Sequence, residues 1–438
     1  MSLVHNETRV HGGADLAAIV VRCMMCGERV PADRPVTQCP ACGDLLDVEL
    51  SLTGPIDAAD FGRDLPPRLT TSGVWRYQAL LPRLPEEAIV SRAEGNTPIY
   101  WDDRLARYAG LDRIGLKHEG QNPTGSFKDR GMTVGISHAK AVGARVVACA
   151  STGNTSASLA SYAAAAGMTA LVLVPEGKIA GGKLAQTIAH GARIVQVQGD
   201  FDAALRLLRR LTEERPVYLV NSVNPFRLEG QKTIVFELLE QLGWQVPDVI
   251  ALPGGNLGNT AAFGKALADL RAAGLIDRLP RLLTVQAAGA APFAAYYASG
   301  FTSYQPVTAE TVATAIKIGS PASVERARRA IELTDGWVTT VTDDEILDAK
   351  AEIDRVGIGC EPASAASLAG VRRLVREGAI RPDASVVGIL TGHLLKDADA
   401  VVNYHLGDRD GQPRPGANRP VTIPADYSAL ERTLADAL

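Results

Sequence analysis

The residue with the clearest chemical potential is Lys128, which stands in the run Gly125-Ser-Phe-Lys-Asp-Arg-Gly131. A lysine amine forms Schiff bases with carbonyl groups, so such a residue can anchor an aldehyde cofactor and then move protons. A lysine in isolation is far more often a solvated surface charge. The interpretation of Lys128 therefore depends on the groups that accompany it.

Two further runs have the composition of ligand-binding loops. Gly254-Gly-Asn-Leu-Gly-Asn259 follows an apolar, strand-like segment and precedes a helix-like one. Glycines let backbone amides approach a phosphate closely, and a helix N-terminus adds a favourable dipole. An ordinary glycine-rich turn is the alternative, and the run lacks the Gly-x-Gly-x-x-Gly pattern of dinucleotide-binding folds. Residues 151–156 (Ser-Thr-Gly-Asn-Thr-Ser) also lie between a predicted strand and a predicted helix, where a simple helix cap is the alternative.

Four of the six cysteines form two Cys-x2-Cys pairs, with twelve residues between the pairs. The four residues are Cys23, Cys26, Cys39 and Cys42. Two such pairs on adjacent turns present four thiolates tetrahedrally to zinc, whereas disulfides or free thiols are the alternative. A segment this short buries little apolar surface, so a metal would supply the missing free energy of folding. With all four ligands from the protein, the expected zinc is structural and leaves no open position for catalysis.

Apolar runs alternate with amphipathic stretches over most of the chain, which predicts a parallel sheet covered by helices. The predicted strands are 145–150, 170–174, 193–198, 217–220, 249–252, 282–286 and 385–390, and the predicted helices are 156–166, 183–190, 201–214 and 260–272. Thr391-Gly-His393 directly follows the last of these strands, and ligands in α/β proteins bind beyond the carboxyl ends of strands. The polar segment 407–416 predicts an exposed, mobile loop.

Together, the run around Lys128 and the segments 151–155 and 254–260 resemble the active site of the threonine synthase family, which are pyridoxal-phosphate enzymes of fold type II. The resemblance extends from about residue 74 to the C-terminus, with further matching blocks in the expected order. It implies an α/β fold in which two parallel-rich domains close on the cofactor, with the zinc ribbon in front. The expected boundaries are 1–50 for the ribbon, 51–125 and 226–438 for the large α/β domain with the cofactor phosphate site, and 126–225 for the small α/β domain.

The resemblance also implies roles for individual residues. Lys128 would hold pyridoxal 5'-phosphate and act as the catalytic proton carrier. The other cofactor-binding residues would be Asn154 at the ring hydroxyl, Gly255, Asn256, Leu257, Gly258 and Asn259 at the phosphate, and Thr391 at the pyridine nitrogen. The substrate-binding residues would be Ser151, Thr152, Thr155 and Arg227, the last of which grips the substrate phosphate. Glu361 is expected to be structural, and His393 is expected to be a loop residue.

The reaction implied is the conversion of O-phospho-homoserine and water to threonine and phosphate. A cysteate synthase-like replacement on phosphoserine, a threonine or serine dehydratase, and a cofactor-binding protein without turnover are the alternatives. Ser320, Val324, His118 and Gln121 depart from the family's usual blocks, which leaves the exact substrate open.

Composition excludes several other classes. The chain has 438 residues, enough for two or three domains, and its 45 basic and 49 acidic residues give no basic surface for nucleic acid. No apolar run reaches the roughly 18 residues needed to span a bilayer, and residues 1–22 lack the features of a signal peptide. We therefore expect a cytoplasmic protein that binds neither nucleic acid nor membrane. The resemblance to the threonine synthase family implies in addition a homodimer that acts on a small phosphorylated amino acid.

Overall fold

The computed structural model describes residues 16–50, 55–63, 65–177, 181–199, 201–409, 411–414 and 416–435. Residues 1–15, on which the signal-peptide argument partly depends, lie outside this range. The chain divides into two compact units, residues 1–396 and residues 397–438, which are described separately.

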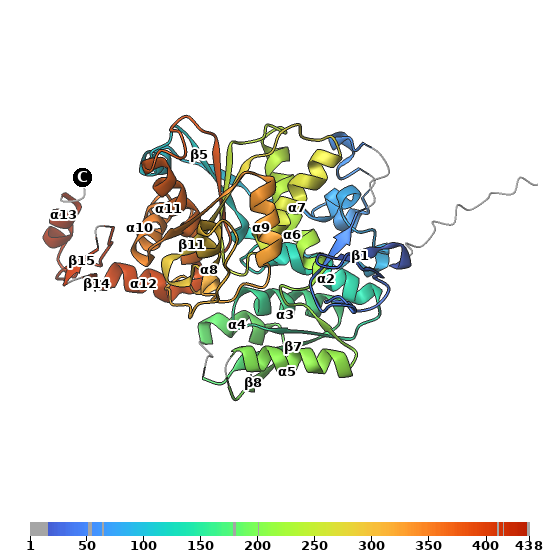
Figure 1. Ribbon diagram of the computed structural model, residues 1–438. Helices are drawn as coiled ribbons and strands as arrows, with labels where there is room; N and C mark the ends of the chain where they lie inside the picture. The colour runs from blue at the N-terminus through green and yellow to red at the C-terminus, as the bar shows by residue number, and fades with distance from the viewer. Residues whose placement is uncertain are drawn as a thin grey trace, which may run out of the picture. The chain divides into compact units, whose positions relative to one another are not determined.

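The larger sheet of the first unit has six strands in the order β12-β11-β10-β13-β5-β4, all parallel except β4. Its strands are β4 (Ile99–Trp101), β5 (Ile114–His118), β10 (Val249–Pro253), β11 (Arg281–Ala287), β12 (Trp337–Val341) and β13 (Val386–Leu390). Alternate side chains enter two different cores, as the period of a strand requires. Ile250 and Leu252 pack with one group of helices, whereas Val249 and Ala251 pack with another. Figure 1 shows helices on both sides of the sheet.

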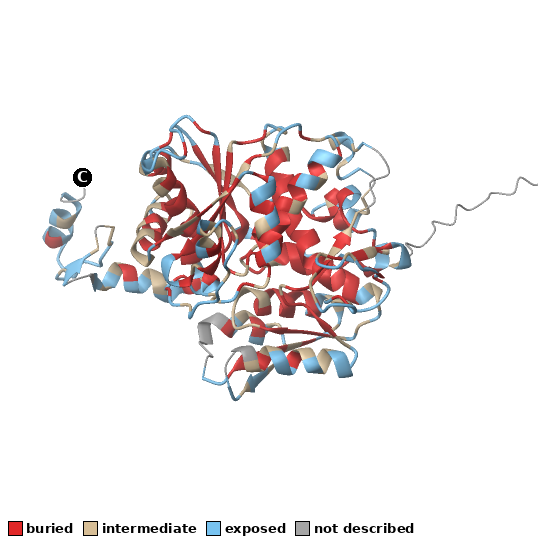
Figure 2. Cartoon of the chain, viewed as in Figure 1, coloured by how far each residue is buried: buried red, intermediate tan, exposed pale blue. Residues whose placement is uncertain are grey.

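The helices around this sheet are α1 (Asp103–Ala109), α6 (Pro225–Gln241), α7 (Gly258–Ala272), α8 (Pro292–Ala298), α9 (Val324–Leu333), α10 (Asp343–Arg355) and α11 (Pro362–Arg376). The first core includes α6, α7 and α9, and the second includes α1, α10 and α11. Buried residues concentrate on the strands and on the helix faces that pack against them (Figure 2).

The smaller sheet has four parallel strands in the order β8-β7-β6-β9. They are β6 (Val146–Ala150), β7 (Thr169–Pro175), β8 (Arg193–Val197) and β9 (Val217–Leu219), and the helices are α2 (Lys128–Ala141), α3 (Asn154–Ala166), α4 (Gly181–Ala189) and α5 (Phe201–Glu214). All predicted strands and helices are confirmed, with ends that differ by at most two residues. The domain boundaries expected from the sequence stay a prediction.

Helices α2 and α6 approach each other closely at two glycines. A Cβ atom added to Gly230 would lie 1.8 Å from the Arg130 carbonyl oxygen, and one added to Gly131 would lie 2.8 Å from the Arg227 carbonyl oxygen. Any larger residue at position 230 would therefore force the two helix backbones apart. This contact matters because α2 begins at Lys128 and α6 carries Arg227.

The N-terminal segment forms a three-stranded antiparallel sheet in the order β2-β1-β3, built from β1 (Val20–Cys23), β2 (Arg29–Pro31) and β3 (Leu46–Glu49). Its apolar side chains, including Val21 and Val48, join a core that contains Trp75 and reaches Phe226 on α6. The segment is thus packed against the body of the first unit.

The second unit contains α12 (Ala398–Leu406), the strands β14 (Asp408–Arg409) and β15 (Gln412–Pro413), and α13 (Tyr427–Ala435). The expectation of a plain loop over 407–416 is wrong, because β14 and β15 pair as a short antiparallel hairpin. Gly411, at φ +74°, takes the left-handed conformation that a tight hairpin turn needs.

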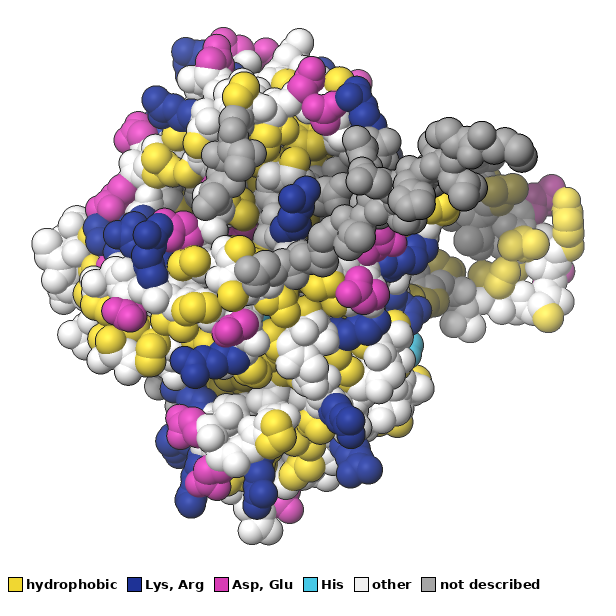
Figure 3. Space-filling view, turned by 90° about the vertical axis from the view of Figure 1, so that its right-hand side faces the viewer, with side chains coloured by type: hydrophobic (Ala, Val, Ile, Leu, Met, Phe, Trp, Pro, Cys, Tyr) yellow, Lys and Arg dark blue, Asp and Glu magenta, His cyan; other side chains and the backbone are white. Residues whose placement is uncertain are grey.

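The face of the molecule shown in Figure 3 has no single dominant charge. Basic, acidic and apolar side chains are interspersed over the face shown in Figure 3. In the part of the chain that the structure describes, no helix has the length and apolar character needed to cross a bilayer.

Candidate active site

The loop that carries Lys128 is attached to the end of β13. Ser126 forms an isolated bridge with Gly392, the Phe127 amide donates to the Thr391 carbonyl at 3.0 Å, and the His393 amide donates to the Gly125 carbonyl at 2.9 Å. Because β10, β13 and β5 are parallel neighbours, their carboxyl ends share one edge of the larger sheet. Lys128 therefore lies at the edge where an α/β protein binds its ligands.

The Lys128 amine has the properties of a nucleophile. Its nitrogen lies 4.1 Å from the centroid of the Phe127 ring. The pKa of Lys128 is lowered to about 7, mainly by loss of hydration and also by the positive charge of Arg227, while the negative charge of Glu361 opposes the shift. A large fraction of this amine is neutral near pH 7, which is the form that attacks a carbonyl group.

Glu361 joins two of the predicted cofactor residues. The Asn154 amide, at the start of α3, donates to a Glu361 carboxylate oxygen at 3.0 Å. The Thr391 hydroxyl lies 3.5 Å from the other Glu361 oxygen and 3.1 Å from the Ser364 hydroxyl. Asn154, Thr391 and the lysine loop thus meet around one buried carboxylate.

The glycine-rich loop after β10 has the form of an anion cradle. Leu257 takes the left-handed conformation at φ +63° with its side chain buried, and α7 begins at the next residue. Asn256 is held from both sides, since its side-chain oxygen accepts from the Ala322 amide at 3.1 Å and its carbonyl from the Ser323 amide at 3.3 Å. The first amides of α7 have no intrahelical acceptor and point toward the loop, as phosphate-binding helix ends do.

The smaller sheet contributes a second group of residues at the ends of β6 and β9, which are adjacent and parallel. Asn221, after β9, bonds both the amide of Ala150 at 3.0 Å and its carbonyl at 3.1 Å. This link places the loop that starts at Ser151 beside the segment that leads to Arg227. Ser151, Thr152 and Thr155 are half-buried in the first of these loops.

Arg227 is a buried cation with spare donors. It is 1% exposed, and its Nη1 donates to the Val220 carbonyl at 3.1 Å. Its Nε and Nη2 have no hydrogen-bond partner among the described residues, and burial lowers the pKa of Arg227 to about 10. Buried charged groups are normally paired, so this guanidinium is suited to an anion that enters from outside the chain.

The residues at the sheet edge fit a phosphorylated aldehyde cofactor: a neutral amine, a helix N-terminus for the phosphate, and an amide and a hydroxyl for a ring. A family model described as "Pyridoxal-phosphate dependent enzyme" matches residues 90–392, so the chain belongs to that family of enzymes. The threonine synthase of Methanocaldococcus jannaschii is 44% identical over 417 residues, which cover 95% of this chain and 99% of that protein. The threonine synthase of Methanosarcina acetivorans is 47% identical over 386 residues, covering 87% and 93%. Within the pyridoxal-phosphate enzymes, the chain therefore belongs to the threonine synthases.

The structure of threonine synthase from Escherichia coli superposes with a TM-score of 0.67 and covers 96% of this chain and 100% of that one. At 19% identity this similarity supports the fold alone. It agrees with the fold type II α/β architecture expected from the sequence.

Two further charged residues lie at this site. Glu361, which was expected from the sequence to be structural, accepts from Asn154 and occupies the N-cap position of α11. Lys396 was not singled out from the sequence. It donates to Gln186 of α4, and burial lowers its pKa while Glu361 and Asp129 oppose the shift.

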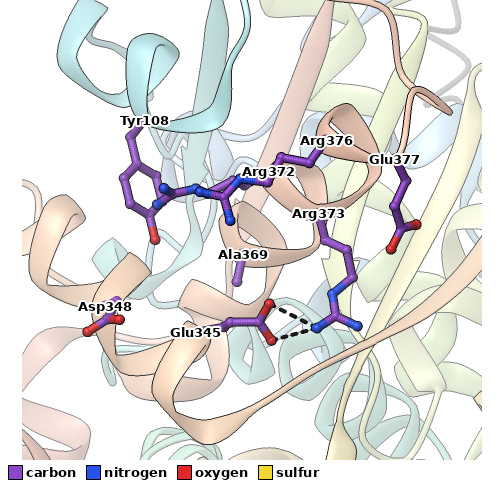
Figure 4. Close-up of a pocket in the computed structure, with 8 residues that line it drawn as sticks. All are labelled: Tyr108, Glu345, Asp348, Ala369, Arg372, Arg373, Arg376 and Glu377. Atoms are coloured by element: carbon purple, nitrogen blue, oxygen red, sulfur yellow. Dashed lines mark hydrogen bonds and ion pairs between the residues drawn. The ribbon is translucent and has the colours of Figure 1, made fainter.

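A charged pocket between α1, α10 and α11 is separate from this site (Figure 4). Arg372 stacks over the Tyr108 ring at 3.8 Å, and Arg373 bonds both Glu345 oxygens at 2.9 and 2.8 Å. Three arginines in its lining face three carboxylates, so the pocket has no net preference for an anion. Arg372 is also eleven residues beyond Glu361 on the same helix, or about 16 Å.

The lowered pKa of Lys128 predicts how the cofactor-free protein takes up pyridoxal phosphate. Only the neutral amine reacts, so the initial rate should rise with pH through a midpoint near 7, rather than near the ordinary lysine value of 10.5. Arg227→Met should move the midpoint to higher pH, because a neighbouring cation disfavours the protonated amine and its removal raises the pKa. Following the visible absorbance at several pH values tests both statements, and a midpoint that Arg227→Met leaves unchanged would contradict the second.

Proposed function

We propose that this chain converts O-phospho-homoserine and water to threonine and phosphate. The observation that carries the proposal is Arg227, a buried guanidinium with two unpaired nitrogens among the described residues, close enough to Lys128 to lower its pKa. A dehydratase acting on threonine or serine has no phosphate that would require such a residue. The nearly full-length similarity to proteins named threonine synthase supports the same reaction.

The cofactor contacts are proposed as expected from the sequence. Lys128 would bond the cofactor covalently, Gly255 through Asn259 would hold its phosphate, Asn154 would bond its ring hydroxyl, and Thr391 would lie at its pyridine nitrogen. When bound, pyridoxal phosphate withdraws electrons from the carbon atoms of the substrate and so makes their protons removable. A neutral hydroxyl at Thr391 does not enforce protonation of the ring, which favours chemistry at the β and γ carbons over transamination.

The chain's own side chains then perform two tasks. Lys128 moves protons at successive substrate carbons, for which a pKa near 7 is well suited. Arg227, with Ser151, Thr152 and Thr155, holds the substrate phosphate while its bond to the γ carbon breaks. Water adds its hydroxyl at the β carbon, a proton is placed on the γ carbon, and phosphate leaves as the second product.

A product assay tests this proposal directly. Purified protein loaded with pyridoxal phosphate is given phosphohomoserine in one arm, phosphoserine with sulfite in a second and threonine alone in a third, and phosphate, ammonia and amino acids are quantified. We expect equal amounts of threonine and phosphate in the first arm alone. Phosphate release only in the second arm would favour a cysteate synthase, and ammonia release from threonine without phosphate turnover would favour a dehydratase. The homodimer and the cytoplasmic location stay predictions.

We also propose a structural zinc ion in the N-terminal segment. The sulfurs of Cys23, Cys26, Cys39 and Cys42 all lie within 4.8 Å of one another, with pairs at 3.4, 3.5 and 3.6 Å. Four sulfurs at about 2.3 Å from a tetrahedral zinc lie about 3.8 Å apart, so the cluster has nearly the dimensions of an occupied site. Positive φ angles at Gly27 (78°) and Gly43 (75°) form the tight turns after each pair.

Metal analysis should therefore find one zinc per chain in protein purified without added metal. Cys42→Ser should lose the metal and lower the melting temperature, since metal binding contributes to folding, without changing the pH dependence of turnover in the protein that remains folded. Cys149→Ser, at a lone buried cysteine in the smaller sheet, is the control that should retain zinc. Absence of metal, or loss of catalysis on chelation without any loss of thermal stability, would contradict a structural role.

A further inference from the structure

His138 on α2 is buried at a junction of four segments. Its Nε2 lies 2.7 Å from the carbonyl oxygen of Ala32, just beyond β2, and its Nδ1 lies 2.7 Å from the Tyr218 hydroxyl. A carbonyl oxygen only accepts, so Nε2 carries the hydrogen and Nδ1 accepts from the tyrosine. Both partners therefore fix one tautomer of a neutral ring, and burial keeps it neutral by lowering the pKa of His138 to about 4.

The imidazole ring of His138 packs face to face against a residue at the start of α6. The Phe226 ring stacks on it with a centroid distance of 3.5 Å and an angle of 10° between the planes. Phe226 immediately precedes Arg227, so the stacked ring fixes the backbone from which the arginine side chain leaves. Val134, one helical turn before His138 on α2, belongs to the same core as Phe226.

Asn224, the N-cap residue of α6, provides a second support for the first turn of this helix. Asn224 accepts from the amides of Phe226 at 3.0 Å and Arg227 at 3.3 Å, and it donates to the Leu219 carbonyl at 2.9 Å. Its side chain also lies near the Tyr218 hydroxyl, the group that donates to His138, and opposes the rise that burial causes in the pKa of Tyr218. The first turn of α6 is thus held through its cap and through Phe226, and both routes lead to His138.

Arg227 depends on such support because its own side chain is weakly held. It makes one hydrogen bond to protein, to Val220, while two of its nitrogens have no partner among the described residues. A binding group of this kind keeps its geometry only if the backbone beneath it is fixed. We propose that His138 is a positioning residue, which through Phe226 and the first turn of α6 keeps Arg227 in place to bind the substrate phosphate. The hydrogen bond to the carbonyl of Ala32, in the N-terminal segment, fixes His138 itself. This inference depends on the proposed role of Arg227.

The test compares two buried tyrosines in otherwise complete, cofactor-loaded protein. Tyr218→Phe removes the donor to His138, whereas Tyr77→Phe removes a buried hydroxyl that bonds Glu240 and lies in a different core. His138→Phe is a third variant, which retains an aromatic ring but loses both hydrogen bonds. The measured quantities are KM and kcat for phosphohomoserine, the inhibition constant of inorganic phosphate, the visible cofactor absorbance and the melting temperature.

We expect Tyr218→Phe and His138→Phe to raise KM and the inhibition constant of phosphate about 5- to 10-fold, the effect of losing roughly one hydrogen bond. The cofactor absorbance should be unchanged, and Tyr77→Phe should leave both constants unchanged even where its melting temperature falls similarly. Equal constants in Tyr218→Phe and Tyr77→Phe would show that His138 only stabilises the fold and would overturn the inference, whether or not His138→Phe folds. Arg227→Ala serves as reference: if it too leaves the inhibition constant of phosphate unchanged, the proposed function itself is wrong.

Discussion

Lys128→Ala should abolish turnover and the visible absorbance of the bound cofactor while the protein remains folded. In the proposed function the lost amine is both the covalent anchor and the proton carrier, and removal of an acid–base group alone typically reduces rates by about 10²–10⁴-fold. The fold should survive because the Lys128 amine forms no ion pair with another described residue and is already destabilised as a cation by burial. Absorbance spectra, turnover and circular dichroism of the variant are the measurements.

Lys140→Ala is a matched control on the same helix. Lys140 is exposed and donates to the Glu87 carbonyl at 2.8 Å, so its loss removes a charge from α2 without touching the site. Its absorbance and turnover should equal those of the unmodified protein. A Lys128→Ala protein that retained the visible band would show that another amine holds the cofactor.

After Lys128→Ala, the substitution Arg227→Ala should have the largest effect on turnover. We expect this effect only with the phosphorylated substrate. Loss of a charge-assisted partner should cost about 2–4 kcal/mol, or roughly 30- to 1000-fold in kcat/KM for phosphohomoserine. If the held phosphate also assists water addition, kcat falls as KM rises, because a contact in the transition state is lost. Side activity on unphosphorylated serine or threonine should change little. Equal losses on phosphorylated and unphosphorylated substrates would instead assign Arg227 a structural role.

The stability of Arg227 variants gives an independent readout. Burial lowers the folded pKa of Arg227 to about 10, below its ordinary value of 12.5, so at any pH below about 10 the charged side chain opposes folding. Arg227→Met should therefore leave the melting temperature of substrate-free protein unchanged or raise it. Arg130→Met is the contrasting variant, since Arg130 is equally buried but bonds Glu119 at 2.7 Å and Glu237 at 2.7 Å. Breaking that network should destabilise the protein by about 3–5 kcal/mol.

The strands and the residues that follow them could be predicted because buried parallel strands appear as continuous apolar runs with glycines or polar residues at their ends. Lys128 and Asn154 were assigned through the resemblance to the threonine synthase family, whereas Thr391 was also marked by its position directly after a strand, and the structure places all three near Glu361. Helix α6 could not be predicted from periodicity. Pro225 through Leu239 are all buried, so this central helix has no polar face and no apolar stripe.

The contacts between distant segments could not be predicted from the sequence either. Lys232 and Glu229 appear as surface charges in a sequence, yet in the structure they form a buried ion pair at 2.6 Å, which Asp269 joins at 2.6 Å. Similarly, nothing in the run around His138 indicates that its ring bonds the carbonyl of Ala32, more than one hundred positions earlier. Such pairings depend on which helices are neighbours, and local composition carries no information about that.

The close packing of α2 against α6 at Gly230 has a consequence for substrate length. In the proposed reaction, one helix begins with the amine that acts on the substrate carbons and the other carries the guanidinium that binds the phosphate, so the contact between the two backbones would limit how these two groups are spaced. Side-chain replacement at Gly230 can only widen the gap between the helices, because a Cβ there would lie 1.8 Å from the Arg130 carbonyl oxygen. A homoserine phosphate and a serine phosphate differ by one methylene. Under the proposed roles of Lys128 and Arg227, the main-chain contact between α2 and α6 would therefore contribute to discrimination between the two substrates.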